Sequence, residues 1–145
     1  MDEFEISTDK QLLNIEYIHS FLSTSYWAKG IPKRMVEKSI NNSFCFGMYK
    51  KQKQIGFARV ITDFAVFAYL ADVFIDKSEQ RKGYGKQLLQ KIFSHEDLKN
   101  LRRWHLVTGD AQKLYEKFGF THPENPLRHM EKQQQPKYQK LTTAT

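Results

Sequence analysis

The chain has 145 residues, which suits one domain, and 40% hydrophobic with 27% charged residues is an ordinary globular composition. No apolar run approaches the roughly 20 residues that a membrane-spanning helix needs, and the acidic N-terminal stretch lacks the apolar segment of a signal peptide. The single cysteine, Cys45, excludes an internal disulfide framework. We therefore expect a cytoplasmic protein that makes no membrane contact.

The net charge of +7 and the isoelectric point of about 9.4 are compatible with a nucleic acid, an acidic surface or a polyanionic cofactor. The basic residues are spread in small groups, and those at 50–53 are interpreted as solvated surface charge. No nucleic-acid motif is recognisable, so we expect no nucleic-acid partner. The five histidines lack metal-ligand spacing, and we expect no metal site.

Helical periodicity dominates the first 43 residues. Thr8 and Gln11 have the spacing of a capping box, and the apolar residues that follow form one broad helix face. A loop with two large aromatic residues, Tyr26 and Trp27, comes next, and Pro32 suits the first turn of a second helix. The predicted elements are a strand at 3–7, a helix ending near Ser23, a loop at 23–31 and a helix from 32 to 40.

Strand patterns dominate the middle of the chain. The pattern at 44–61 predicts a hairpin around the polar turn at 50–53. Cys45 alternates within its first strand, so we expect it to be a core residue and not a nucleophile. The following predicted elements are a central strand at 66–75, a helix at 84–93, a strand at 102–108, a helix at 111–118, short strands at 120–122 and 127–130, and a polar tail at 131–145. This order predicts an α/β (α+β) fold, with a mixed sheet between helices on both faces and one domain at 1–130.

A glycine-bearing turn, Gln80-Arg81-Lys82-Gly83-Tyr84-Gly85, joins the central strand to the next helix. Such a turn presents unpaired backbone N–H groups, and the helix dipole with nearby cations favours a phosphate or diphosphate there. A dinucleotide fingerprint would need glycine at Leu88. A nucleoside-triphosphate loop would need Gly at 80 and Ser or Thr at 87, where this chain has glutamines.

The turn resembles the Q-x-x-G-x-G coenzyme A pyrophosphate loop of the GCN5-related N-acetyltransferases (GNAT family). Residues 111–120, A-x-x-L-Y-x-K-x-G-F, are similar to a second motif of that family and stand 30 residues further along, where the family has it. The resemblance implies the GNAT fold, with a mostly antiparallel mixed sheet whose central strand splays from its neighbour. Two departures are Arg81, where the family often has glycine, and the position three residues before Ala111, which is Thr108 instead of asparagine.

The resemblance implies acetyl-CoA as the cofactor. Its pyrophosphate would contact the turn and its pantetheine arm would pair with the splayed strand. Arg81 would offer its N–H with a negative φ, and either Thr108 or Asp110 would replace the family's asparagine. The cofactor-binding residues implied are Val73, Phe74, Ile75, Gln80, Arg81, Lys82, Gly83, Tyr84, Gly85, Lys86 and Asp110.

Tyr115 is the residue implied for catalysis, as a hydrogen-bond donor to the departing thiolate. A phenol with a pKa near 10 is a weaker acid than a thiol near 8.5, so a modest lowering of its pKa or proton transfer through solvent is expected. Asp72, which interrupts an apolar strand, and Asp63 are candidate general bases; Asp72 could also anchor the acceptor or be paired inside the protein. Tyr26 and Trp27 either wall the acceptor site or pack in the core.

The resulting hypothesis is an acetyl-CoA-dependent N-acetyltransferase that moves an acetyl group directly to a primary amine of a small molecule or peptide. The alternative is a non-catalytic acyl-CoA-binding regulatory protein of the same fold. A homodimer is left open, and nothing in the residues identifies the acceptor.

Overall fold

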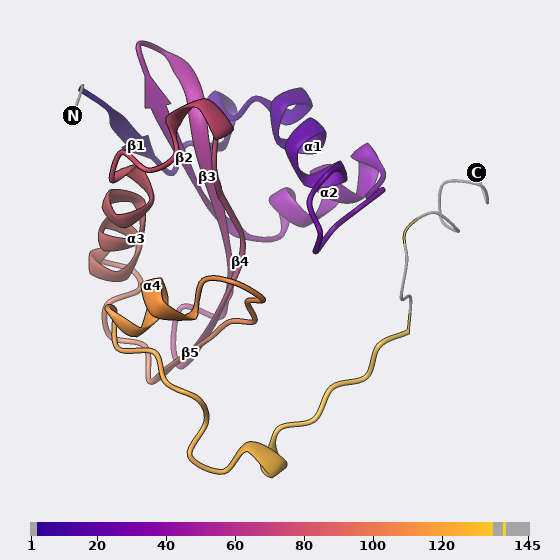
Figure 1. Cartoon of the computed structure of the whole chain (residues 1–145), viewed down its shortest axis with the longest axis vertical. Helices are drawn as coiled ribbons and strands as arrows, with labels where there is room; N and C mark the ends of the chain where they lie inside the picture. Colours follow the sequence, from indigo (N-terminus) through magenta and orange to yellow (C-terminus); the bar gives the residue numbers. More distant parts are fainter. Residues whose placement is uncertain (1–2, 135–137, 139–145) are drawn as a thin grey trace.

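A five-stranded sheet runs through the middle of the molecule, in the order β1-β2-β3-β4-β5 (Figure 1). The computed structural model describes residues 3–134 and 138. The first three pairings are antiparallel, and β4 pairs with β5 in parallel, so the predicted mixed and mostly antiparallel sheet is confirmed. The strands are β1 (Glu5–Ser7), β2 (Phe44–Lys50), β3 (Lys53–Thr62), β4 (Phe67–Ile75) and β5 (Arg103–His105).

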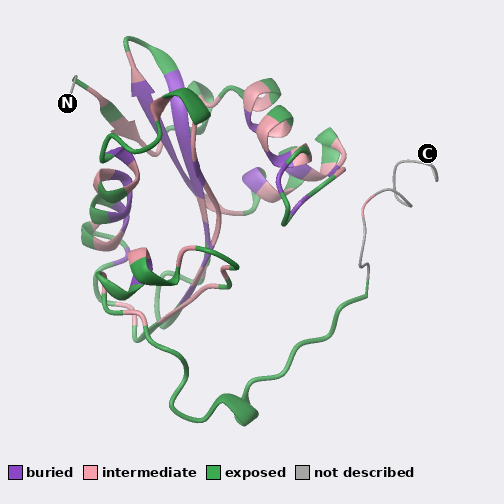
Figure 2. Cartoon of the chain, in the orientation of Figure 1, coloured by how far each residue is buried: buried purple, intermediate pink, exposed green. Residues whose placement is uncertain are grey.

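Helices cover both faces of this sheet (Figure 1). Two separate groups of buried side chains result, one under each pair of helices, and Figure 2 shows their burial along the inner faces. Cys45 lies in one of these cores, and burial raises the pKa of its thiol to about 11, which agrees with a packing role. The helices are α1 (Ile15–Ser23) and α2 (Lys33–Asn41) on one face, and α3 (Tyr84–Ser94) and α4 (Gln112–Glu116) on the other.

The first helix begins later than the sequence predicted. A short 3₁₀ turn, η1 (Lys10–Leu12), is capped by Asp9, and α1 then begins after Asn14, whose side chain accepts a hydrogen bond from the N–H of Tyr17. The capping box predicted from Thr8 and Gln11 is therefore wrong. Asparagine and aspartate are equally good N-caps, and the two caps divide what we predicted as one helix.

The hairpin and the central strand were predicted nearly to the residue. Lys51 and Gln52, the two turn residues between β2 and β3, both have left-handed backbone angles, with φ of 51° and 66°. Two consecutive left-handed residues are typical of the type I′ turn, whose twist matches that of the paired strands. This hairpin supplies the rigid frame against which β4 pairs.

The sheet splays open between β4 and β5. Their pairing covers only three positions, from Phe67 opposite Arg103 to Tyr69 opposite His105. β4 continues to Ile75, and within residues 3–134 no strand pairs with its 70–75 portion on that side. The splayed central strand is thus confirmed, and it leaves one backbone edge open.

A β-bulge lies in this open portion of β4. Ala71 pairs with Arg59 and Phe74 with Phe57, so two residues, Asp72 and Val73, stand opposite one residue of β3. Asp72 has a φ of 55°, which is rare for a residue other than glycine. A bulge bends its strand and increases the local twist, so it turns the end of β4 away from β5.

The C-terminal part differs most from the prediction. β5 has three residues rather than the predicted seven, and neither predicted short strand, at 120–122 or at 127–130, forms. A 3₁₀ turn, η3 (Pro126–Arg128), occupies part of the second, and every residue from 121 to 134 is exposed (Figure 2). Most of the predicted tail at 131–145 lies outside the described residues.

The bulge is held by an ion pair, and this pair can be tested. Asp72 Oδ2 accepts a hydrogen bond from Arg59 Nε at 2.8 Å, with the side chains only 11% and 17% exposed. We expect Asp72→Asn, which tolerates the left-handed backbone, to lower the free energy of unfolding by about 1–3 kcal/mol because Arg59 loses its counter-charge. Chemical denaturation of D72N, R59Q and the double variant measures the three losses of unfolding free energy. The loss in the double variant should be smaller than the sum of the losses in the two single variants.

The matched control is the exposed pair of Glu16 and Lys33, whose side chains are 74% and 44% exposed. Glu16→Gln should leave the free energy of unfolding nearly unchanged, because solvent screens an exposed ion pair. Additive effects of D72N and R59Q would show that the two side chains do not stabilise the bulge together.

Candidate functional site

The turn before α3 has the backbone shape of an anion site. Gly83 is the N-cap residue with a φ of 90°, and Arg81 also lies in the left-handed region with a φ of 64°. The negative φ expected for Arg81 is therefore wrong. Left-handed residues alternating with right-handed ones turn successive N–H groups toward one concave side, which suits a bound anion.

The N–H groups of this turn are available. Within the part of the chain that the structure describes, none of the backbone N–H groups from 81 to 86 donates a hydrogen bond, and Gly83 supplies no side-chain cap. The first N–H groups of any helix lack intrahelical acceptors, and the helix dipole places partial positive charge beside them. The arrangement can bind a phosphate or diphosphate through the backbone alone.

The cations around the turn are not equivalent. Arg81, Lys82 and Lys86 are all exposed. Lys82 Nζ lies 3.2 Å from Glu79 Oε1, which also accepts a hydrogen bond from Lys50 Nζ at 3.0 Å. The hydrogen bond from Lys50, followed by that from Lys82, keeps the pKa of Glu79 below its usual value, so its negative charge offsets part of the charge of Lys82. Arg81 and Lys86 remain the more effective cations for an anionic ligand.

Two side chains of the predicted cofactor set have structural roles. Gln80 Nε2 donates to the carbonyl oxygen of Ile75 at 2.9 Å and so ties the turn to the end of β4. The Tyr84 ring is 2% exposed and meets Phe4 edge-on at 5.8 Å between ring centres. Only the backbone N–H of Tyr84 faces the turn, so a ligand there would contact its main chain and not its phenol.

Val73, Phe74 and Ile75 form the open edge of β4 next to this turn. The ring of Phe74 is 5% exposed and stacks on Phe21 at 3.9 Å between ring centres. Its side chain is thus core, as expected in either interpretation. The backbone beyond Tyr69 has no strand partner toward β5 among the described residues, which leaves hydrogen-bonding groups for an extended ligand.

Tyr115 is buried on α4, with 8% of its surface exposed. Burial, with smaller effects of the nearby Tyr26 and Asp110, raises the pKa of its phenol to about 12. Of the two alternatives that we predicted, the lowered pKa is therefore wrong, and proton transfer through solvent stays a prediction. Tyr115 stays protonated at any physiological pH and can donate a hydrogen bond, but full transfer of its proton to a thiolate would be uphill by about 5 kcal/mol.

Tyr26 and Trp27 connect the two sides of the gap between β4 and β5, which we call the mouth of the splay. The Tyr26 hydroxyl accepts a hydrogen bond from the N–H of Gly109 at 3.1 Å and donates to Asp110 Oδ1 at 3.4 Å, while Trp27 Nε1 donates to Asp72 Oδ1 at 2.9 Å. The two rings are 64% and 42% exposed and meet edge-on at 5.2 Å. They line a surface, so the interpretation that they pack in the core is wrong, and their place beside an acceptor stays a prediction.

The structure also distinguishes Thr108 from Asp110 as the replacement for the family's asparagine. The Thr108 hydroxyl accepts hydrogen bonds from the N–H groups of Ala111 at 3.1 Å and Asp110 at 3.4 Å, so it organises the start of α4. The Asp110 side chain is exposed beside Tyr26 and keeps oxygen atoms available. Asp110 is the better placed of the two for contact with a ligand.

Neither predicted general base is well suited to that task. Asp63 accepts hydrogen bonds from the N–H groups of Ala65, Val66 and Phe67, of which Val66 has the largest effect, and together they lower the pKa of its carboxyl. Asp63 therefore stabilises the β3–β4 loop. Asp72 was considered as a general base, as an anchor for the acceptor or as a carboxylate paired inside the protein, and the structure shows the last of these. Its partner Arg59 was missed, because only the register between β3 and β4 brings them together.

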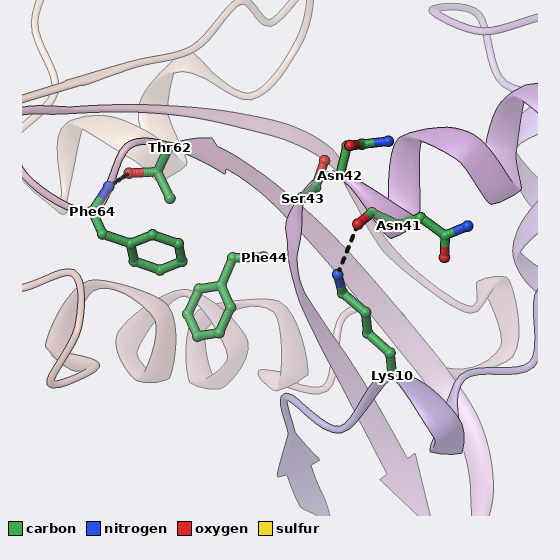
Figure 3. Close-up of a pocket in the computed structure, with 7 residues that line it drawn as sticks. All are labelled: Lys10, Asn41, Asn42, Ser43, Phe44, Thr62 and Phe64. Atoms are coloured by element: carbon green, nitrogen blue, oxygen red, sulfur yellow. Dashed lines mark hydrogen bonds between the residues drawn. The ribbon is translucent and has the colours of Figure 1, made fainter.

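Two cavities accompany these residues. One of about 340 Å³ lies at the start of β2 and the end of β3, where Phe44 and Phe64 approach each other and Lys10 Nζ donates to the carbonyl of Asn41 (Figure 3). The other, of about 1290 Å³, lies beside β5, and Thr108 and Tyr115 belong to its lining. Among residues 3–134 and 138, no cluster of histidine, cysteine or carboxylate side chains could hold a metal, and no helix is long and apolar enough to cross a membrane.

Three comparisons with known proteins agree on the family. The model of the acetyltransferase (GNAT) domain matches residues 41–122. A candidate acetyltransferase of Gibberella zeae is 32% identical over 79% of this chain and 77% of its own. The crystal structure of a candidate GNAT acetyltransferase from Xanthomonas campestris pv. campestris superposes with a TM-score of 0.89 at 45% identity, over 92% of this chain and 94% of that one.

A more distant structure shares the fold alone. The GNAT acetyltransferase of Elizabethkingia anophelis, crystallised with acetyl-CoA bound, has a TM-score of 0.66 at 17% identity, over 94% of this chain and 91% of its own. The sheet that splays at β4, the α3 turn and the match to the family model together lead to one conclusion: the chain belongs to the GNAT family of acetyltransferases.

Proposed function

We propose that this protein is an acetyl-CoA-dependent N-acetyltransferase that acetylates a primary amine. The observation that carries the proposal is the adjacency of two unsatisfied backbone surfaces, the N–H groups at 81–86 and the open edge of β4 at 70–75. The first suits a diphosphate and the second suits an extended amide-bearing arm. Coenzyme A has both groups in that order, and the relative from Elizabethkingia anophelis has acetyl-CoA bound.

In this proposal the protein holds the cofactor mainly with its main chain. The turn would bind the pyrophosphate, Arg81 and Lys86 would add positive charge, and Gln80 would keep the turn against β4 through its bond to Ile75. A site made of backbone groups is already in place before binding, so little ordering entropy is lost. Val73, Phe74 and Ile75 would pair with the pantetheine arm, and Asp110 would lie near its thioester end.

The proposed reaction is direct acyl transfer. The amine nitrogen attacks the thioester carbonyl carbon, the carbon–sulfur bond breaks, coenzyme A leaves as a thiolate, and the nitrogen loses one proton. Tyr115 would donate a hydrogen bond to the sulfur as negative charge develops there. Because the pKa of Tyr115 is raised, the proton that finally neutralises the thiolate would come from solvent.

The acceptor is proposed to enter beside Tyr26, Trp27 and Asp110. A primary amine is mostly an ammonium at neutral pH, and aromatic faces with a nearby carboxylate attract such a cation. Asp63 and Asp72 are occupied by other groups, so the amine would lose its proton to water in the open mouth of the splay. The exposure of both rings supports this location.

Tyr115→Phe tests the chemical step. We expect kcat to fall by about 10- to 1000-fold while the affinity for coenzyme A changes little, because the hydrogen bond is made only as charge develops. Thiol release from acetyl-CoA over a panel of primary amines gives kcat, and calorimetry with coenzyme A gives affinity. The fold-loss should stay constant from about pH 6 to 10, because a phenol whose pKa is about 12 remains protonated over that range.

Tyr49→Phe is the matched control. Tyr49 is also 8% exposed and burial also raises its pKa to about 12, but it lies on β2, away from the cleft. Its kcat should equal that of the wild type. Equal losses in both variants would contradict the role of Tyr115, and acetyl-CoA binding without thiol release for any amine would favour the non-catalytic alternative.

Gly83→Ala and Gly85→Ala test the diphosphate turn as a pair. Alanine at 83 must adopt a φ of 90°, at a cost of about 1–2 kcal/mol, or turn the N–H groups away, so we expect coenzyme A binding about 10-fold weaker or worse. A Cβ at Gly85 would meet Ile75 Cγ1 at an ordinary 3.8 Å, so G85A should bind within about 3-fold of the wild type. Calorimetry with coenzyme A measures both, and equal affinity of both variants would show that the turn does not hold the cofactor.

A further inference from the structure

His105 ends β5 at the point where the sheet opens. It stands opposite Tyr69 in the last of the three pairs that join β4 to β5, and the gap begins at the next residue of β4. Its neighbour Trp104 packs on the core that contains Tyr84 and Leu88 of α3. Because successive side chains of a strand point to opposite faces of the sheet, His105 points to the face that carries α1 and α2.

This face is also the one from which the aromatic loop reaches the mouth of the splay. Tyr26 and Trp27 belong to the loop between α1 and α2, whereas Tyr115 lies on α4, on the opposite face. His105 and Tyr115 both line the cavity of about 1290 Å³ beside β5. The gap therefore has a phenol on one side and an imidazole on the other, and the proposed acceptor enters on the side of the imidazole.

The imidazole of His105 is held in place without a hydrogen bond. Its ring is partly buried and nearly parallel to the ring of Tyr69, at 5.7 Å between centres, and to that of His129, at 6.1 Å. Within residues 3–134 and 138, neither of its ring nitrogens has a hydrogen-bond partner, whereas His19 and His95 each have one ring nitrogen bonded to a backbone group. The nitrogen of His105 that lacks a proton is thus available to accept one.

The groups around the ring leave it as the best available base. The titratable and charged side chains that surround it, from β3, β4, β5 and the segment after α4, are Arg59, Tyr69, Asp72, Arg103, His129 and Glu131. Burial, followed by the charge of Asp72, raises the pKa of the Tyr69 phenol, so this phenol stays protonated at neutral pH. Asp72 is paired with Arg59. An imidazole, with an ordinary pKa of about 6.5, is a stronger base than a carboxylate such as Asp110, whose ordinary value is about 4.

We propose that His105 is the general base of the acetyl transfer and takes, through one water molecule in the mouth of the splay, the proton that the acceptor amine loses. This role rests on the function proposed above. As the amine nitrogen bonds to the carbonyl carbon, one N–H proton passes to the water, and the water gives a proton to the free ring nitrogen of His105. The imidazolium then returns its proton to solvent, while the hydrogen bond from Tyr115 stabilises the thiolate on the other side of the gap.

Two variants separate a base from a side chain that only packs. His105→Phe keeps a flat ring between Tyr69 and His129 but has no nitrogen, and His105→Ala leaves space for a small molecule. With acetyl-CoA and ethylamine, we expect both variants to form N-ethylacetamide at least about 100-fold more slowly than the wild type. Calorimetry should show unchanged affinity for coenzyme A. His122→Ala is the matched control, because His122 lines the same cavity but is exposed, and its rate should equal that of the wild type.

Chemical rescue identifies the function that is lost. Imidazole added to H105A should raise the rate at least about 10-fold, whereas pyrrole, a ring of the same size without a basic nitrogen, should not. No gain with imidazole, or an equal gain with pyrrole, would overturn the proposal. Wild-type rates in both variants would overturn it while the acetyltransferase function stands. A wild type that acetylates neither ethylamine nor any other amine of the panel would overturn both.

Magnetic resonance provides a measurement that needs no turnover. With coenzyme A bound and the pH held constant, ethylamine hydrochloride should shift the ring Cε1–H signal of His105, which is identified by its absence from H105F. The signal of His95, whose ring meets Phe44 and Phe46 edge-on, should stay unchanged. Potassium chloride at the same concentration controls for ionic strength. A His105 signal that responds equally to both salts would show that the amine does not approach the ring, and the assignment of His105 as the base would be wrong.

Discussion

The bulge at Asp72 is the constraint on which the open edge of β4 depends. One extra residue bends the strand away from β5, and the strained φ persists because Arg59 and Trp27 hold both carboxylate oxygens of Asp72. Strained backbone of this kind is retained where the surroundings fix it, and often beside a functional site. The carboxylate therefore acts through the shape of the strand, and its partners from β3 and from the aromatic loop join the sheet to the mouth of the splay.

The two faces of the sheet contribute different parts of the site. On one face, the α3 turn offers main-chain N–H groups and exposed cationic side chains, which suit a highly charged group that remains near water. On the same side, α4 keeps the Tyr115 phenol in a dry environment, where a hydrogen bond to a developing charge is stronger than in water. The opposite face supplies exposed aromatic rings from the α1–α2 loop. In the function proposed above, charge binding, chemistry and acceptor contact would thus fall to different elements around the gap between β4 and β5.

Local patterns predicted most of the fold, and several of the errors share a cause. The hairpin, the central strand and the glycine turn are fixed by neighbours in sequence, so periodicity and turn residues were sufficient. Two features depend on distant residues: the pairing of Asp72 with Arg59 and the raised pKa of Tyr115. The predicted strand at 127–130 does not form, and Leu127 and Met130 stand three positions apart, which is not the alternation of a strand. The choice of N-cap for the first helix was a simpler error, since Asp9 and Asn14 are both common N-cap residues and both stand in the sequence.

The hydroxyl of Tyr26 has a consequence for how the two ligands communicate. It connects a loop from one helical layer to the first residues before α4 in the other layer, across the gap in the sheet. An incoming amine that competes for Asp110 or for that hydroxyl would loosen the start of the helix that carries Tyr115. In the function proposed above, recognition of the acceptor and alignment of the phenol would then share one free-energy balance, so that a poorly fitting amine would be penalised in turnover as well as in affinity.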